Sequence, residues 1–161
     1  MKAYIGIGTN IGNREENIKA ALTAINHLPG TEVAKVSAVY ETEPWGYTQQ
    51  DNFYNICAEV ETALSAKAFL GACLGIEAAF GRERPFKNAP RIIDIDLLLY
   101  KGITMNEAEL TVPHPRIGER AFVMVPLKDV LMNLALDDAD YNDEYNKCDK
   151  SGVNKLFNID I

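Results

Sequence analysis

The chain has 161 residues, 47% of them hydrophobic, which is enough apolar material for one domain with a buried core. Its formal net charge of −7 opposes a protein that coats nucleic acid, because such proteins normally present a basic face. The three cysteines show no metal-binding spacing, and no apolar run reaches the length of a membrane span. We therefore expect a cytoplasmic protein that binds neither nucleic acid nor a membrane.

The N-terminal segment predicts a strand followed by a helix. Residues 2–8 are apolar and contain Tyr and Ile, which favours a buried strand. After a turn, Asn13 stands at an N-cap position and Glu16 at the matching position of a capping box. Apolar residues then recur at helical spacing until Pro29, which ends the predicted helix.

Four further elements complete the predicted core. Residues 32–40 are rich in Val and predict a second strand, and residues 53–60 alternate as a third strand. A second helix is expected over residues 65–80, and residues 92–100 are the most strand-like segment of the chain. The order is typical of the α+β, ferredoxin-like split βαβ (βαββαβ) fold, an antiparallel sheet with helices on one face. The other face is then open for a site.

The C-terminal third predicts additions to this core. A short element near residues 110–112 and a helix after Pro126 are expected. The periodicity then weakens, and we assign no structure to residues 137–150. We expect a single domain over residues 1–134, followed by an acidic C-terminal tail over residues 135–161.

Asp94 and Asp96 are the strongest indication of chemistry. Because side chains alternate along a strand, both carboxylates fall on one face, about 6–7 Å apart along the backbone. Two like charges on a partly buried sheet repel each other unless a cation offsets them, and Mg²⁺ commonly takes a couple of carboxylates plus phosphate oxygens. A solvated strand face or a structural Asp–Arg pair is the alternative. The opposite face, which we expect to pack against the helices, carries Ile93, Ile95, Leu97 and Leu99.

A cluster of cations precedes the two aspartates. Residues 82–91 include Arg82, Arg84, Lys87 and Arg91. The planar fork of arginine binds phosphate oxygens well, so several arginines beside a metal site indicate a polyphosphate clamp. An ordinary solvated loop is the alternative.

Two loop residues are further candidates. His114 lies between two prolines, which restrict where its imidazole points. It is equally consistent with a phosphate contact and with a structural loop histidine. Trp45, the only tryptophan, lies in a polar loop, where it fits a movable aromatic lid or a residue packed on the domain edge.

From residue 3 to about residue 132 the chain resembles the 6-hydroxymethyl-7,8-dihydropterin pyrophosphokinases. The most specific matches are Pro90-Arg91-Ile92-Ile93-Asp94-Ile95-Asp96-Leu97 and Val112-Pro113-His114-Pro115-Arg116. The resemblance implies a ferredoxin-like fold and transfer of pyrophosphate from ATP to the hydroxyl of the pterin, releasing AMP, in folate biosynthesis. Its partners would be ATP and the pterin, and we expect a monomer.

The resemblance also implies roles for individual residues. Asp94 and Asp96 would hold two Mg²⁺ ions and, with Arg82 and Arg91, would be catalytic. Residues that would bind ATP are Glu77, Arg82, Arg84, Arg91, Leu110, Thr111, His114 and Arg120. Residues that would form the pterin slot are Thr42, Glu43, Trp45, Phe53, Asn55 and Phe122. The chain departs from the family at Asn88 and Ala89, where members often carry Trp and Gly.

Two other functions share parts of this pattern. A single-strand RNA binder can have the same topology, but it needs exposed aromatic side chains and a basic sheet face. A two-metal nucleotidyl cyclase or polymerase-like domain can also present paired aspartates on such a sheet. Neither explains Asn55 together with the Val112–Arg116 motif.

Overall fold

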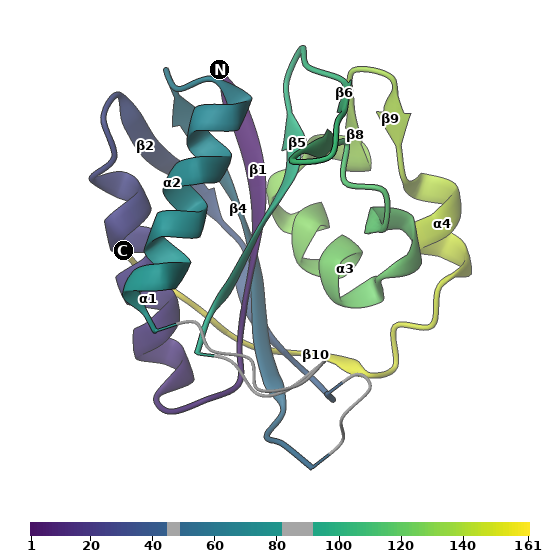
Figure 1. Cartoon of the computed structure of the whole chain (residues 1–161). Helices are drawn as coiled ribbons and strands as arrows, with labels where there is room; N and C mark the ends of the chain where they lie inside the picture. The colour runs from purple at the N-terminus through teal and green to yellow at the C-terminus, as the bar shows by residue number, and fades with distance from the viewer. Residues whose placement is uncertain (45–48, 82–91) are drawn as a thin grey trace.

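The computed structural model describes residues 1–44, 49–81 and 92–161. Its centre is a six-stranded sheet (Figure 1). The strands are β1 (Lys2–Thr9), β2 (Thr31–Val36), β3 (Ala38–Thr42), β4 (Phe53–Thr62), β5 (Asp94–Tyr100) and β10 (Val153–Asn158). They follow the order β10-β3-β4-β1-β5, with β2 also on β4, and all pairs are antiparallel. The prediction of an antiparallel sheet combined with helices is confirmed.

Helices α1 (Arg14–Asn26) and α2 (Ala66–Ala79) pack together on one face of the sheet (Figure 1). Both begin where the caps predict, because Asn13 Oδ1 accepts from the Glu16 N–H at 3.1 Å and Ser65 Oγ from the Ala68 N–H at 3.2 Å. Their apolar stripes and the inward side chains of β1, β4 and β5 form the first buried core.

Helix α3 (Ala121–Val130) lies on the opposite face and forms a second core with Tyr4, Cys57, Leu98 and Leu99. The sequence placed this helix after Pro126, but the helix contains Pro126 within it. Burial of Val123, Met124 and Leu127 outweighs the missing proline N–H. No helix in the described part of the chain is both long and apolar enough to cross a membrane.

Two strand irregularities escaped the sequence pattern. The predicted strand over residues 32–40 is divided at Ser37, whose Oγ accepts from the Cys57 N–H at 2.9 Å in place of a backbone acceptor. In β5 the register shifts, because Ile5 faces Leu97 whereas Tyr4 faces Leu99. This bulge turns Leu99 into the second core, so its predicted position against α1 and α2 is wrong.

The C-terminal segment has regular structure. After η2 (Met132–Leu134) come a hairpin of β8 (Ala135–Leu136) and β9 (Ala139–Asp140), helix α4 (Asn142–Lys147), and strand β10. Strand β10 pairs with β3 from Val153↔Thr42 to Asn158↔Ala38 and so becomes the sheet edge. No structure was assigned to residues 137–150 from the sequence, because these contacts are made to distant parts of the chain.

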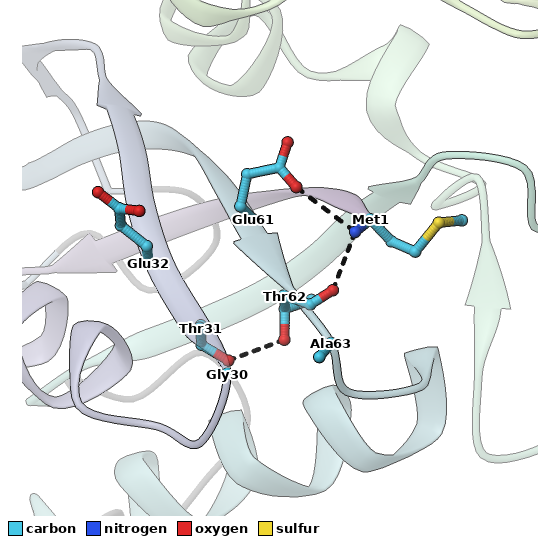
Figure 2. Close-up of a pocket in the computed structure, with 7 residues that line it drawn as sticks. All are labelled: Met1, Gly30, Thr31, Glu32, Glu61, Thr62 and Ala63. Atoms are coloured by element: carbon cyan, nitrogen blue, oxygen red, sulfur yellow. Dashed lines mark hydrogen bonds and ion pairs between the residues drawn. The ribbon is translucent and has the colours of Figure 1, made fainter.

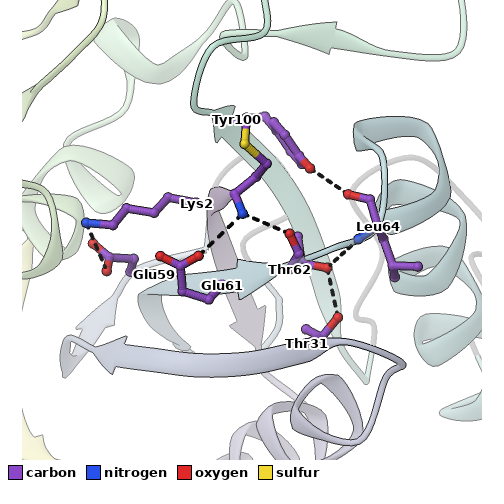
Figure 3. A network of polar contacts seen from close by, with 8 residues as sticks. Lys2, Thr31, Glu59, Glu61, Thr62, Leu64 and Tyr100 are labelled. Carbon is purple, nitrogen blue, oxygen red and sulfur yellow. Dashed lines mark hydrogen bonds and ion pairs between the residues drawn. The ribbon is translucent and has the colours of Figure 1, made fainter.

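At one end of the sheet a pocket of about 420 Å³ lies beside the N-terminus (Figure 2). The Met1 amino group donates to the Thr62 carbonyl at 3.0 Å and pairs with Glu61 at 3.4 Å. The hydroxyls of Thr31 and Thr62 are hydrogen-bonded to each other. The backbone of Leu64 then connects them to Tyr100, because its N–H donates to the Thr62 hydroxyl and its carbonyl accepts from the Tyr100 hydroxyl (Figure 3). These bonds join the ends of three strands, which gives the polar residues of this pocket a structural role.

Candidate functional site

A cavity of about 920 Å³ opens on the sheet face that carries α3. Residues of β1, β3, β4 and β5 form its floor, and the segment 114–123 and residues 148–149 form its sides. Gly6 and Gly8 stand on this face of β1, opposite Asp96 and Asp94 of β5. The two positions of β1 that pair with the aspartates therefore carry no side chain.

Asp94 and Asp96 both line this cavity and are only partly buried. The start of β5 is held to the end of β1, because the buried Thr9 hydroxyl donates to the Ile92 carbonyl and accepts from Asn17 Nδ2 at 3.2 Å. The described residues contain no group of three His, Cys, Asp or Glu side chains that could bind a metal by itself. Two carboxylates in an open cavity suit Mg²⁺, whose other ligands are commonly water and substrate phosphates.

Glu77 lies behind β5 rather than in the cavity. It is 2% exposed, and its Oε2 accepts from the backbone N–H of Ile95 at 2.8 Å. Ile95 stands between the two aspartates, so this bond from α2 fixes the strand segment that presents them. The direct ATP contact implied by the resemblance stays a prediction.

His114 is oriented by backbone bonds at the cavity wall. The backbone N–H of His114 donates to the Leu98 carbonyl at 2.8 Å. The ring Nδ1 of His114 accepts from the backbone N–H of Arg116 at 3.2 Å. In the neutral imidazole this leaves the proton on Nε2, a donor suited to a phosphate oxygen. Burial, and then the nearby cations of Arg120 and Arg116, lower the pKa of His114 below its ordinary value.

Arg120 connects this wall with the aspartates. Its guanidinium lies 5.6 Å from the centre of the Phe122 ring. Burial and the charge of Arg116 lower the pKa of Arg120, whereas the carboxylates of Asp96 and Asp94 oppose this shift. Positive and negative groups therefore meet in one cavity, as a site for a metal-bound polyphosphate requires.

A second set of cavity residues includes an amide, a hydroxyl and two aromatic rings. Buried Asn55 donates from Nδ2 to Thr42 Oγ1 at 2.7 Å. A Cβ at Gly8 would lie 2.9 Å from Asn55 Oδ1, so only glycine permits this amide position. Phe53, Phe122 and Glu43 line the same cavity. An amide and a hydroxyl that line a cavity together with two aromatic rings can bind the edge of a heterocycle.

Six further predicted residues are not among the described residues that line the cavity. Trp45, Arg82, Arg84 and Arg91 are outside the described residues. Leu110 is buried, and Thr111 belongs to β7 (Thr111–Val112), which pairs with β6 (Met105–Asn106). Neither lines the cavity.

The cavity also contains residues that sequence reasoning did not select. Arg116 and Glu119 are close in sequence to the predicted residues His114 and Arg120, so the same motif could have predicted that they line the cavity. Gln50 accepts at 2.7 Å from Asn10, a residue buried at the end of β1. Cys148 and Asp149 come from the C-terminal segment, where no pattern in the sequence pointed to a site.

Comparison with known proteins gives a consistent result. The model of a family described as 7,8-dihydro-6-hydroxymethylpterin-pyrophosphokinase (HPPK) matches residues 4–132. A Methylorubrum extorquens protein named 2-amino-4-hydroxy-6-hydroxymethyldihydropteridine pyrophosphokinase is 39% identical over 155 residues, 96% of this chain and 98% of that protein. A Bacillus subtilis protein of the same name is 39% identical over 128 residues, 80% of this chain and 77% of that protein.

Solved structures share the fold. A Plasmodium falciparum HPPK-DHPS triple mutant with pteroate superposes with a TM-score of 0.66 at 16% identity. The match covers 91% of this chain and 43% of that chain, so this chain spans less than half of the larger protein.

Proposed function

This chain belongs to the 7,8-dihydro-6-hydroxymethylpterin-pyrophosphokinase family, and we propose that its cavity carries out the corresponding reaction. ATP donates its β,γ-pyrophosphoryl group to the hydroxyl of 6-hydroxymethyl-7,8-dihydropterin, a step of folate biosynthesis. The observation that carries this proposal is the joining of two sites in one cavity. The paired carboxylates, His114 and Arg120 form one set of lining residues, and the Asn55–Thr42 pair with Phe53 and Phe122 forms the other.

Transfer needs the hydroxyl oxygen in line with the β-phosphorus. The new O–P bond forms as the bond to the oxygen bridging the α- and β-phosphorus breaks, and AMP leaves with that oxygen. Such reactions depend on positioning and charge neutralisation more than on covalent help from the protein. Bound Mg²⁺ supplies charge neutralisation and polarisation of the phosphoryl group.

The protein contributes ligands, donors and orientation. Asp94 and Asp96 would hold the metal, and a pair of carboxylates is consistent with two Mg²⁺ ions. His114 Nε2 and the Arg120 guanidinium donate to phosphate oxygens, alongside Arg82 and Arg91 as predicted clamps. Asn55 and Thr42 orient the pterin edge while Phe53 and Phe122 cover its faces and exclude water.

The finer fold assignment belongs to the same proposal. The chain order β1, α1, β2 with β3, β4, α2, β5 and the neighbour order β5-β1-β4-β3 support a ferredoxin-like split βαβ core. We also infer a cytoplasmic monomer, which the three free cysteines and the net charge of −7 support.

The test is a direct assay. The protein is incubated with ATP, Mg²⁺ and 6-hydroxymethyl-7,8-dihydropterin, and AMP and the pterin diphosphate are separated by chromatography. Both products should appear in equal amounts and only when the pterin is present. Release of ADP, or formation of AMP without pterin, contradicts the proposal. Binding of single-stranded RNA without turnover would favour the binding-module alternative.

A further inference from the structure

The C-terminal segment reaches the cavity after helix α4, which packs on α3. Helix α4 ends at Lys147, and the next two residues, Cys148 and Asp149, line the cavity. The chain then enters β10, whose first residue, Val153, faces Thr42. Residues 148–152 are therefore the link between α4 and the sheet edge, and the first two residues of this link line the cavity.

Several bonds hold this link in place. Cys148 donates its N–H to the Glu144 carbonyl at 2.9 Å and its thiol to the Tyr145 carbonyl at 3.2 Å. Lys150 Nζ donates to the Cys148 carbonyl at 3.1 Å and lies 4.6 Å from the centre of the Tyr145 ring. On α3, Lys128 also lies 4.6 Å from that ring centre. The link is thus docked on α3 through Tyr145.

The strand that follows the link pairs with a strand that carries cavity residues. Thr42 pairs with Val153 on one side and with Phe53 on the other, and its hydroxyl accepts from Asn55. Cys148 packs against the second core, as does Phe122. The link therefore shares the cavity with the groups assigned above to the pterin and leads into the strand that pairs with Thr42.

We propose that Cys148 is a specificity-determining residue that forms the outer wall of the pterin slot, its side-chain size limiting the space for the ring system. The Cys148 thiol donates to the Tyr145 carbonyl, and its sulfur accepts from Lys150 Nζ at 3.8 Å. Its hydrogen-bonding groups are therefore used within the link, and the side chain limits the space for substrate by size rather than by a hydrogen bond. The docking of α4 and β10 gives that side chain a fixed position. This inference rests on the proposed function.

The experiment compares Cys148→Phe with Lys147→Phe. Lys147 is exposed, stands next to Cys148 and does not line the cavity. Steady-state kinetics give KM for the pterin and for ATP separately. Cys148→Phe should raise the pterin KM about tenfold or more, with the KM for ATP changed less than about twofold. Lys147→Phe should change neither constant.

Cys148→Ala serves if the larger side chain prevents folding, as judged by circular dichroism. This variant removes the sulfur atom, whose contact area is similar to that of a methylene group. Its loss should raise the pterin KM about three- to fivefold and leave the KM for ATP unchanged. An unchanged pterin KM in a folded variant, or an equal rise in both constants, overturns the inference. Absence of pterin-dependent AMP from the unaltered protein would instead refute the proposed function.

Discussion

The two faces of the central sheet are built from the same strands but carry different side chains. Along β1, Ala3, Ile5 and Ile7 are buried against α1 and α2, whereas Gly6 and Gly8 stand on the cavity face. The face that packs against α1 and α2 is filled with apolar side chains. The opposite face, which carries α3, leaves space for polar side chains in the cavity. The first core under α1 and α2 thus supplies stability alone, whereas the opposite face combines the second core with the cavity, so mutations in the first core and in the cavity lining should separate stability from chemistry.

The largest effect is expected at the carboxylates of the cavity face. Asp94→Ala or Asp96→Ala should lower kcat at least about 10³-fold, because each removes a ligand for the metal that neutralises the phosphates. Thermal stability should not fall, since loss of one like charge relieves repulsion. Production of AMP and a thermal melt measure the two properties. Asp138→Ala is the control, because Asp138 is exposed and does not line the cavity. Full activity in excess EDTA would contradict the metal assignment.

The first core under α1 and α2 should respond in the opposite way. Phe69 of α2 is completely buried in the first core. Phe69→Ala should lower the free energy of unfolding by about 3–5 kcal/mol through lost burial and a cavity. The KM values of the folded fraction should remain unchanged. Leu74→Ala on the exposed side of α2 should cost less than about 0.5 kcal/mol. Urea unfolding measures both variants, and equal losses would refute the contrast.

Gly8→Ala tests whether space on the cavity face matters. The new Cβ would meet Asn55 Oδ1 at 2.9 Å, so the amide must move away from Thr42. We expect the pterin KM to rise about tenfold, while the KM for ATP changes less than about twofold. Gly6→Ala makes only an ordinary contact with Leu98 at 3.6 Å and should affect the pterin KM less. A larger effect at Gly6 would contradict the assigned pterin end.

The smallest effect concerns the charge of His114. Its lowered pKa keeps the imidazole mainly neutral near pH 7, and a bound triphosphate should raise that pKa. ATP binding should therefore take up part of a proton near pH 6, and affinity should rise less than about tenfold from pH 7 to pH 6. Calorimetry in two buffers of different ionisation enthalpy measures the uptake. His114→Gln should abolish it, and undiminished uptake in that variant would assign the proton to another group.

The same shift affects stability in a defined direction. Folding lowers the pKa of His114, so the unfolded chain binds more protons once the pH falls below the unfolded value of about 6.5. Stability is thus lost as the pH falls from about 6.5 through the lowered pKa. The loss from this group should be absent in His114→Gln, which a series of melts at falling pH would show.

Local patterns predicted much of the fold. The caps at Asn13 and Ser65 and the alternation in residues 53–60 depend on nearest neighbours, and the structure confirms them. The division at Ser37 and the bulge at Leu98 were missed. Both depend on the facing strand, and three consecutive leucines carry no alternation that could reveal a bulge.

For the cavity, the sequence by itself determined the chemical types of residue: a carboxylate pair on one strand face, a histidine between prolines, an asparagine and two Phe rings. Only the tertiary structure placed Glu77 behind β5 and brought residues 148–149 into the same cavity as Thr42. Motifs record which groups stand close along the chain. Strand pairing between residues far apart in sequence decides which of these groups share a cavity, and the cost of ordering such contacts is offset only when the complete core forms.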